Sequence, residues 1–357
     1  MSTFNTAILN TLVSYAIKGA GFVNDLELSS YIGIKIADGK INFNTTDGTQ
    51  YTRVSADCSA DDFDVVVEAE TFAKLISKIN SDTVDIDIVD NNLVIKGNGK
   101  YTLGIKPDEN GNPLSFPNKF PATVTEIGKL TTADIAIVGS AIKASLSSVV
   151  DSVTSNYYFG DIIASTDRAM LSVYDCKVFD EPYLFNKKFV ELFSMPGTDV
   201  TISKSDTMLV ANSDIGDVGS LSVCTRLNTD VSNFNVAGIN KFLALEVGSF
   251  CRFRKAQMLD LLDRMALFVS KFDDGAITLN FTADSIEVSS LTNDGVESVE
   301  ITECKNPQDM SITINIDRLR NQLKSYNSDM VDLYYGSDIC IKLVDGNITQ
   351  IIALIKK

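Results

Sequence analysis

The chain has 357 residues, of which 45% are hydrophobic, and a formal net charge of −16. This length exceeds one ordinary domain and the apolar content is that of a folded protein, which excludes a largely disordered chain. The first residues do not resemble a signal peptide, and no apolar run reaches the roughly 18 residues of a membrane span. We therefore expect a soluble, cytoplasmic protein with no membrane partner. The acidic balance, taken alone, argues against nucleic acid as a partner.

Metal and cofactor chemistry find little support in the composition. Histidine, the commonest metal ligand and general base, is absent, and the six cysteines show no Cys-x-x-Cys spacing. In an intracellular protein such cysteines are expected to lie buried at strand ends rather than in disulfides. We expect no metal and no cofactor.

The first third of the chain begins with a predicted helix at 4–18, where apolar residues recur mostly at helical spacing. A strand that runs directly into an amphipathic helix is predicted at 66–76. Alternating apolar and polar residues predict further strands at 31–37, 40–45, 51–56, 84–89, 92–96 and 101–105. The segment 108–121 has the composition of an exposed linker.

The middle third repeats this order. A helix is predicted at 132–148 and a second strand–helix segment at 183–193. Strands are expected at 156–164, 170–174, 200–204, 207–211 and 220–225. The first third has two predicted strands at its start, 31–37 and 40–45, whereas 156–164 is predicted as a single strand. The middle third is therefore expected to lack the hairpin that joins such a pair.

The last third has the same order again. A helix is predicted at 255–271 and a third strand–helix segment at 313–323. Strands are expected at 277–281, 286–291, 298–302, 330–335, 339–343 and 348–355.

The three strand–helix segments share one apolar helix face. Its residues are Phe72, Leu75 and Ile76, then Phe189, Leu192 and Phe193, then Leu319, Gln322 and Leu323, with Gln322 as the polar exception. An acid–cysteine pair precedes each segment, and these pairs recur 118 and 128 residues apart. This long period predicts three domains, at 1–123, 124–247 and 248–357. Hairpin-connected strands with two helices in each domain indicate an α+β fold built on antiparallel sheets.

Positive charge is concentrated in six helical segments, at 4–18, 69–79, 131–148, 186–194, 253–271 and 316–325. They carry 13 basic and 6 acidic residues, a net charge of +7, which leaves −23 for the rest of a chain whose total is −16. Such a protein can present one positive face to phosphate groups while its other surfaces repel them. Ordinary solvated helix faces are the alternative interpretation.

Several short segments together resemble a known family. They are 45–48 (TTDG) with 53–54 (RV), 92–105 (NLVIKGNGKYTLGI), 156–159 (NYYF), 165–167 (STD) and 255–267 (KAQMLDLLDRMAL). Their order and spacing, over essentially the whole chain, resemble the bacterial-type DNA polymerase sliding clamp, the DNA polymerase III beta subunit family, in a divergent or viral member. None of these segments is specific by itself.

The resemblance implies a non-enzymatic processivity factor of DNA replication. Such a clamp is a head-to-tail homodimer that closes six domains into a ring around double-stranded DNA, without sequence preference, and binds a DNA polymerase and a clamp loader. Edge strands of the first and third domains would pair across subunits. Helices would line the hole, with these implied DNA-lining residues: Lys18, Lys74, Lys78, Lys143, Lys187, Lys188, Lys255, Arg264, Arg318, Arg320 and Lys324.

The resemblance also implies a pocket for partner peptides between the second and third domains. Its walls here would be Phe159, Thr166, Met170, Leu171, Ala353, Leu354 and Ile355. The sequence departs from the family at two places: Arg168-Ala169-Met170 replaces a glycine-histidine-arginine, and the terminus lacks the family's methionines and proline. A changed partner motif is therefore expected.

Two other classes of function have less support from the sequence. Ser140 and Lys143 match the Ser-x-x-Lys pattern of acyl-transfer enzymes, but they lie within a predicted helix and lack a Lys-Thr-Gly segment. The chain is therefore not expected to be an enzyme. The stronger alternative is a viral structural or adaptor protein that retains the clamp fold without encircling DNA.

Overall fold

The computed structural model describes residues 2–22, 28–147, 149, 153–228, 230–292 and 294–356, and only the backbone of Lys271. The chain forms two compact units. Unit 1 contains Met1–Ile135 and Lys188–Leu227, and unit 2 contains Ala136–Lys187 and Asn228–Lys357. No helix in the described ranges is long and apolar enough to span a membrane.

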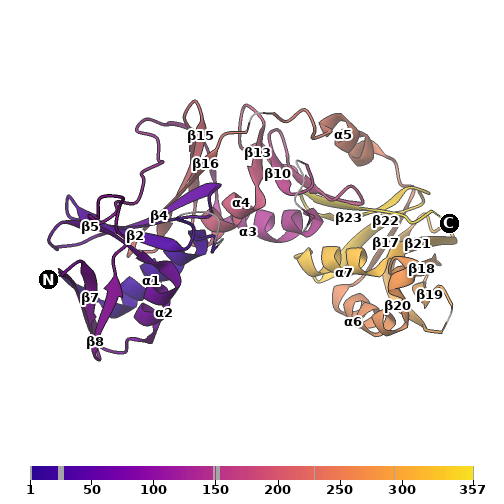
Figure 1. Ribbon diagram of the computed structural model, residues 1–357. Coiled ribbons are helices and arrows are strands. Elements are labelled where there is room, and N and C mark those ends of the chain that lie inside the picture. The colour runs from indigo at the N-terminus through magenta and orange to yellow at the C-terminus, as the bar shows by residue number, and fades with distance from the viewer. Residues whose placement is uncertain are drawn as a thin grey trace. The chain divides into compact units, whose positions relative to one another are not determined.

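One order of elements occurs three times along the described chain (Figure 1). Repeat 1 consists of β1 (Ser2–Asn5), α1 (Thr6–Ala16), β2 (Tyr31–Ala37), β3 (Lys40–Thr46), β4 (Gln50–Asp57), β5 (Phe63–Glu68), α2 (Ala69–Lys78), β6 (Thr83–Val89), β7 (Asn92–Lys96) and β8 (Lys100–Gly104). Repeat 2 consists of β9 (Thr125–Leu130), α3 (Thr132–Ile137), β10 (Asn156–Phe159), β11 (Ile163–Thr166), β12 (Met170–Tyr174), β13 (Tyr183–Asn186), α4 (Lys187–Ser194), β14 (Val200–Lys204), β15 (Met208–Ile215) and β16 (Gly219–Arg226). Repeat 3 consists of β17 (Ser249–Arg254), α6 (Lys255–Met265), β18 (Ala276–Phe281), β19 (Ser285–Ser290), β20 (Val296–Lys305), β21 (Met310–Asn315), α7 (Ile316–Ser325), β22 (Met330–Tyr335), β23 (Cys340–Asp345) and β24 (Ile348–Ala353).

The strand pairing explains why three repeats form two units. In unit 1 the strands run in the order β5-β2-β3-β4-β16-β15-β14-β9, so β4 of repeat 1 pairs with β16 of repeat 2. In unit 2 the order β13-β10-β11-β12-β24-β23-β22-β17 is the same, and β12 pairs with β24. Each half of repeat 2 thus belongs to a neighbour's sheet. The domain limits at 123/124 and 247/248 stay a prediction, although the strands of each repeat fall inside them.

Two further groups of strands complete the sheets, and all named pairings are antiparallel. Unit 1 has a separate sheet in the order β1-β6-β7-β8, and the sheet of unit 2 continues from β17 through β20-β19-β18-β21. The predicted α+β class with antiparallel sheets is confirmed.

Two of the strand–helix segments are continuous because the residue that ends the strand caps the helix. Asn315 has the extended backbone of a strand (φ −76°, ψ 127°), yet its side chain accepts a hydrogen bond from the Arg318 amide at 2.9 Å. Glu68 plays the same part for α2. A side-chain cap satisfies amides that have no partner inside the helix, so no loop is needed between strand and helix.

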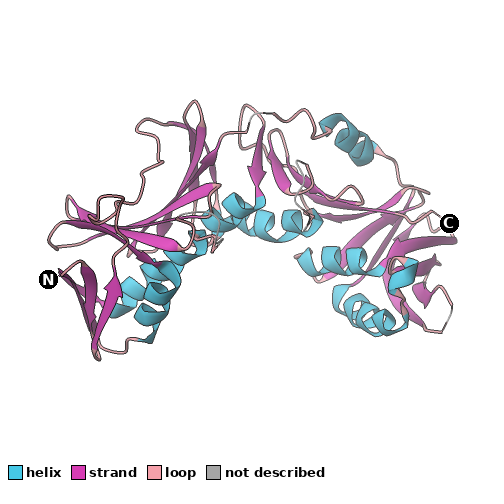
Figure 2. Cartoon of the chain, viewed as in Figure 1, coloured by secondary structure: helices cyan, strands magenta, loops and turns pink. Residues whose placement is uncertain are grey.

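In each unit, considered separately, two helices lie side by side on one face of the sheet (Figure 2). In unit 1 these are α1 and α2, and in unit 2 they are α6 and α7. The anchors Phe72, Phe189 and Leu319 of the three strand–helix segments are at most 1% exposed. The burial of these faces against β-sheet residues is the main apolar contribution to the fold.

Gln322 is fully buried, as is Leu192 at the same position in the second copy, whereas Leu75 in the first copy is half-buried. Its side chain lies in a polar cluster, where Nε2 donates to Ser145 Oγ at 2.7 Å and Ser145 Oγ lies 2.8 Å from Ser172 Oγ. A buried amide is tolerated when hydrogen-bonded. The polar exception in the sequence therefore marks a hydrogen-bonded contact between α7 and the segment around Ser145.

The first predicted helix is shorter than expected. The segment 4–18 begins with β1, which pairs with β6, and α1 starts only after Asn5. Asn5 accepts a hydrogen bond from the Ile8 amide at 3.1 Å and so defines the helix start.

The other two predicted long helices also end early. The segment 132–148 is α-helical only to Ile137 and continues as a π-helical turn (Val138–Ile142) and a 3-10 turn (Lys143–Ser145), while Ser148 lies outside the described residues. The segment 255–271 is α-helical to Met265, followed by a 3-10 turn at Ala266–Phe268.

Repeat 2 contains the hairpin that the sequence was expected to lack. Residues 156–164 are not one strand, because the chain reverses after Phe159 and the Gly160 amide donates to the Ile162 carbonyl at 3.0 Å. A helix that was not predicted, α5 (Val236–Ala244), follows β16. The expectation of two helices in each domain is therefore wrong for the range 124–247.

The cysteines agree only in part with the expectation of burial. Cys224, Cys251 and Cys340 are buried, whereas Cys58, Cys176 and Cys304 are half-buried.

Candidate functional site

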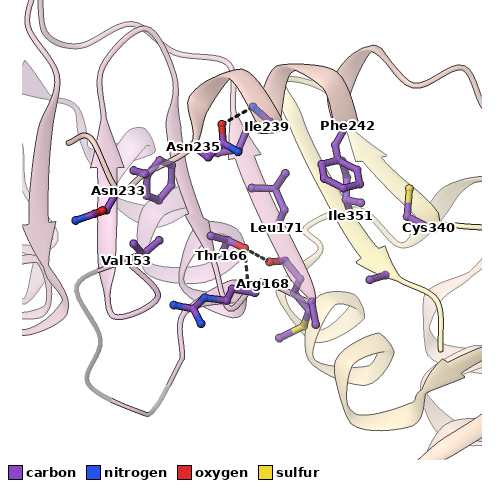
Figure 3. Close-up of a pocket in the computed structure, with 15 residues that line it drawn as sticks. Val153, Thr166, Arg168, Leu171, Asn233, Asn235, Ile239, Phe242, Cys340 and Ile351 are labelled. Carbon is purple, nitrogen blue, oxygen red and sulfur yellow. Dashed lines mark hydrogen bonds between the residues drawn. The ribbon is translucent and has the colours of Figure 1, made fainter. Parts of the chain in front are cut away.

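A groove in unit 2 lies between α5 and the outer face of the sheet, the face opposite α6 and α7 (Figure 3). Its volume is about 320 Å³. The lining residues are mostly apolar: Val153, Thr166, Arg168, Ala169, Met170, Leu171, Asn233, Phe234, Asn235, Gly238, Ile239, Phe242, Cys340, Ile351 and Ala353. An apolar concavity with a few polar groups at its edge suits a peptide with large apolar side chains.

One edge of the groove is the tight turn between β11 and β12. Thr166 Oγ1 donates to the Met170 carbonyl at 2.6 Å and accepts from the Arg168 amide at 2.9 Å. The Asp167 carboxylate accepts from the Ala169 amide at 2.9 Å. These bonds fix the turn and hold Arg168 at a φ of +76°, a left-handed conformation that only glycine adopts without strain.

The opposite wall is α5. Asn235 caps its first turn by accepting from the Gly238 amide at 2.9 Å. Before the helix, Phe234 stacks on Tyr158 of β10, with ring centroids 4.9 Å apart and planes at 11°. Figure 3 shows Ile239 and Phe242 of α5 on the groove side, near Leu171 of β12 and Ile351 of β24.

The structure brings together four of the seven predicted pocket residues. Thr166, Met170, Leu171 and Ala353 line the groove, the first three from the turn and β12 and the last from β24.

The remaining three predicted pocket residues do not line the groove. Phe159 is fully buried and stacks on Phe185 at 4.5 Å. Leu354 packs against the core beneath α6 and α7, and the Ile355 amide donates to the Thr313 carbonyl at 2.8 Å, so the end of the chain turns toward β21.

Sequence reasoning missed the α5 wall altogether. A signal was present: Asn235 is a favourable cap, and Val236, Ile239 and Leu243 follow at helical spacing. Gly238 and the short length hid it, because glycine disfavours a helix interior and a nine-residue helix is not stable alone but depends on tertiary contacts.

The predicted DNA-lining residues lie on the helices or at their ends. Lys18, Lys74, Lys78, Lys143, Arg264 and Lys324 are exposed, and Lys187, Lys188, Lys255, Arg318 and Arg320 are half-exposed. They do not have the same electrostatic surroundings, however.

Several of these cations are neutralised locally. Lys74 pairs with Glu70, Arg264 pairs with Glu297, and Arg320 contacts Asp263 at 3.1 Å and Asp317 at 2.7 Å. The hydrogen bonds between Arg264 and Glu297 lower the pKa of the Glu297 carboxyl.

Lys255 has a structural contact. Its Nζ donates to the Tyr326 carbonyl at 2.7 Å, at the C-terminal end of α7, where helix carbonyls lack partners. Within the described residues, six of the predicted cations form no ion pair and are the most available to an external anion: Lys18, Lys78, Lys187, Lys188, Arg318 and Lys324.

Neither protein-family models nor curated protein sequences match this sequence. Solved structures do match along the full chain. The DNA polymerase III subunit beta from Borrelia burgdorferi, in complex with a natural product, has a TM-score of 0.85 at 17% identity and covers 99% of each chain. A putative DNA polymerase III beta subunit from Eubacterium rectale has a TM-score of 0.84 at 18% identity, covering 99% of this chain and 98% of that one. The sliding clamp from Pseudomonas aeruginosa bound to griselimycin has a TM-score of 0.84 at 14% identity, covering 100% and 99%. Over its whole length, this chain has the α+β fold of the DNA polymerase III beta subunits.

Proposed function

We propose that this protein is a DNA sliding clamp, a non-enzymatic processivity factor that encircles double-stranded DNA in replication and tethers a DNA polymerase. The observation that carries the proposal is the threefold repeat, whose fold matches solved sliding clamps over the whole chain. Each repeat corresponds to one clamp domain, at 1–123, 124–247 and 248–357. Retention on DNA by a closed ring requires only weak contacts with the duplex.

DNA contact is assigned to the helix faces. Phosphate contacts need exposed cations and carry no base specificity, which suits a protein that slides. The predicted cations without an ion pair are the best candidates, namely Lys18, Lys78, Lys187, Lys188, Arg318 and Lys324. Lys255 and Arg320 are held by contacts of their own. The acidic remainder of the surface would keep DNA from binding elsewhere.

The strand pairing within the units supports ring closure. The last strand of repeat 2 pairs with β4, and the last strand of repeat 3 pairs with β12. By the same rule, β8 of repeat 1 would pair with β20 of repeat 3 in a second copy. β8 ends its sheet, and residues 296–300 of β20 pair with β19 but not with β17, so both segments present unpaired amides and carbonyls that such a partner satisfies. Two copies related head to tail would then join six repeats in a closed ring.

Apolar exposure at both edges supports this interface. Val296 at the start of β20 is 54% exposed, and the neighbouring Phe268 is 49% exposed. A Cβ added to Gly295 would lie 2.9 Å from the Phe268 ring, which places that ring beside β20. On the other edge, Tyr101 of β8 is 38% exposed and Lys100 faces solvent, a complement to the acidic β20.

We expect Val296→Glu to convert a dimer, measured by light scattering, into a monomer.

The groove beneath α5 is assigned to apolar peptide tails of the polymerase and of a clamp loader. Its lining is mostly apolar, and Arg168 stands at its edge. The clamp structures that match this chain include complexes with a natural product and with griselimycin, which shows that those clamps bind other molecules.

The DNA assignment is tested by two matched triple variants. In one, the unpaired Lys78, Lys188 and Lys324 become Gln; in the other, the paired Lys74, Arg264 and Arg320 become Gln. Removing one phosphate contact lowers the slope of log affinity against log salt by about 0.9. We expect the salt dependence of DNA affinity to become clearly less steep in the first variant. In the second variant the change should be smaller. If the first variant and the unmodified protein have equal slopes, the assignment is refuted. If the unmodified protein is a monomer that binds no DNA, the adaptor alternative is favoured.

A further inference from the structure

The helix α5 packs on unit 2 through Ile239, while Val236, Leu243 and its C-cap Leu245 are partly buried against the same hydrophobic cluster. Ile239 is its one buried side chain, and Phe242 on the same face is 42% exposed. The stacking of Phe234 on Tyr158 holds the segment just before the helix. The apolar contacts at the C-terminal end of α5 are only partly buried, so a polar attachment there would further stabilise the groove wall.

Lys342 supplies that attachment. It lies on β23, on the outer face of the sheet, and is 7% exposed. Its Nζ donates to the Leu243 carbonyl at 2.9 Å and to the Leu245 carbonyl at 2.6 Å. Leu243 is in the last turn of α5 and Leu245 is its C-cap. Carbonyls at a helix C-terminus lack intrahelical partners and carry partial negative charge, so an ammonium group binds them well.

A buried lysine with this geometry is not ordinary surface charge. No carboxylate forms an ion pair with Lys342 among the described residues, and burial lowers the pKa of its ammonium group. Burying a cation is unfavourable unless it is hydrogen-bonded. The two carbonyls of the α5 terminus are the groups that compensate for this burial.

The equivalent position in unit 1 has no lysine. Strand register pairs Ile351 with both Leu171 and Lys342 in unit 2, and pairs Cys224 with both Tyr51 and Val210 in unit 1. Val210 thus stands where unit 2 has Lys342, and within the described residues no helix covers that face of unit 1. Of the two units, the one with a lysine at this position is the one in which the C-terminal end of a helix lies over the sheet.

We propose that Lys342 is a positioning residue that fixes α5 over the sheet and thereby sets the width of the groove for an apolar partner peptide. The role of the groove in this statement rests on the proposed clamp function. The positioning of α5 by Lys342 does not, because it is a property of the isolated chain.

Cys340 offers a direct readout. It lines the groove two residues before Lys342 on the same face, and it is 1% exposed. Cys251, in the same unit, is fully buried in the core on the opposite face. Release of α5 would expose Cys340 alone, whereas general unfolding of unit 2 would expose both.

The experiment compares Lys342→Met with Lys342→Arg and with Lys241→Met, which removes an exposed lysine of α5 itself. The rates of N-ethylmaleimide labelling at Cys340 and Cys251 are measured by peptide mapping, and amide hydrogen exchange is measured over 236–244. No DNA or partner is present, so the outcome is independent of the clamp assignment.

We expect Lys342→Met to raise the labelling rate of Cys340 and the amide exchange rate over 236–244 by about tenfold or more. Local opening of α5 must precede both labelling and exchange. The labelling rate of Cys251 should stay unchanged. Loss of the nearby ammonium raises the pKa of the Cys340 thiol and by itself slows labelling, so acceleration reports access. Lys342→Arg and Lys241→Met should retain the slow rate. An unchanged Cys340 rate in Lys342→Met, a parallel rise at Cys251, or an equally fast Lys342→Arg would overturn the proposal.

Discussion

The two units contain the same seam between repeats, with different coverings. In unit 1 the seam is the β4–β16 pair, and in unit 2 it is the β12–β24 pair. The linker after repeat 1 lies on the outer face of the first seam, where Arg53 contacts the Phe120 ring at 4.4 Å and donates to Asn118 at 2.9 Å. The linker after repeat 2 forms α5 over the second seam and leaves a groove. The same architecture thus supports a closed surface in one unit and an open groove in the other.

A single pair of positions accounts for much of this difference. Register places Gly33 of β2 and Tyr158 of β10 at equivalent sites, opposite Asn44 and Ala164. In unit 1, a Cβ on Gly33 would lie 2.3 Å from Phe116, so the linker ring packs directly on the backbone. In unit 2, Phe234 stacks on the Tyr158 ring instead. The Tyr158 ring holds the linker of unit 2 away from the strand backbone, whereas Gly33 lets the linker of unit 1 pack directly against it.

The largest effect is expected from Tyr158→Ala. Loss of a buried aromatic side chain destabilises a protein by about 3 to 5 kcal/mol, and here it also removes the support of Phe234. Urea unfolding followed by circular dichroism measures the change. Tyr158→Phe keeps the stack and should cost about 1 kcal/mol or less. Equal losses in the two variants would contradict the role of the ring.

The converse change, Gly33→Ala, should disturb unit 1. The added methyl group overlaps Phe116, and overpacking of this kind destabilises by about 1 to 3 kcal/mol. Gly248→Ala is the control, since no atom lies within 4 Å of its added Cβ. The double variant Gly33→Ala/Phe116→Ala should be less destabilised than the sum of its single changes; strict additivity would rule out the close approach.

An intermediate effect is expected on partner binding rather than on stability. Phe242→Ala removes a half-exposed ring from the groove and should weaken polymerase stimulation about tenfold, or about 1.4 kcal/mol. Phe120→Ala in the linker of unit 1 is the matched control and should leave stimulation unchanged. The assignment of binding to the second seam fails if the two changes have the same effect.

The smallest effect concerns the turns at the two seams. Both turns use a threonine and an aspartate, but Gly48 (φ +89°) occupies the left-handed position in unit 1 and Arg168 (φ +76°) occupies it in unit 2. Arg168→Gly should stabilise the protein by about 0.5 to 1 kcal/mol by relieving backbone strain, and Gly48→Ala should destabilise it by about 1 kcal/mol. Thermal unfolding of both variants checks the opposite signs. A loss of stability in Arg168→Gly would show that the guanidinium contributes more than the strain costs.

The repeat was predictable from sequence because its markers are local. The anchors Phe72, Phe189 and Leu319 lie on continuous strand–helix segments, where side-chain spacing alone reports the buried face. The hairpin at Gly160 was missed because β10 and β11 are both buried and apolar, so period-two alternation does not separate them. The α5 wall of the groove was missed for another reason: its position depends on contacts of Lys342 and Tyr158, which are more than 70 residues away in the sequence.

Ring closure around DNA is the central claim, and it is tested most directly by retention on circular DNA. The purified protein, with a clamp loader where one is needed, is bound to nicked circular DNA and washed, and the circle is then linearised. We predict retention on the circle and loss on linearisation, because a closed ring slides off a free end. Equal retention on circular and linear DNA would contradict the claim and would indicate ordinary surface binding.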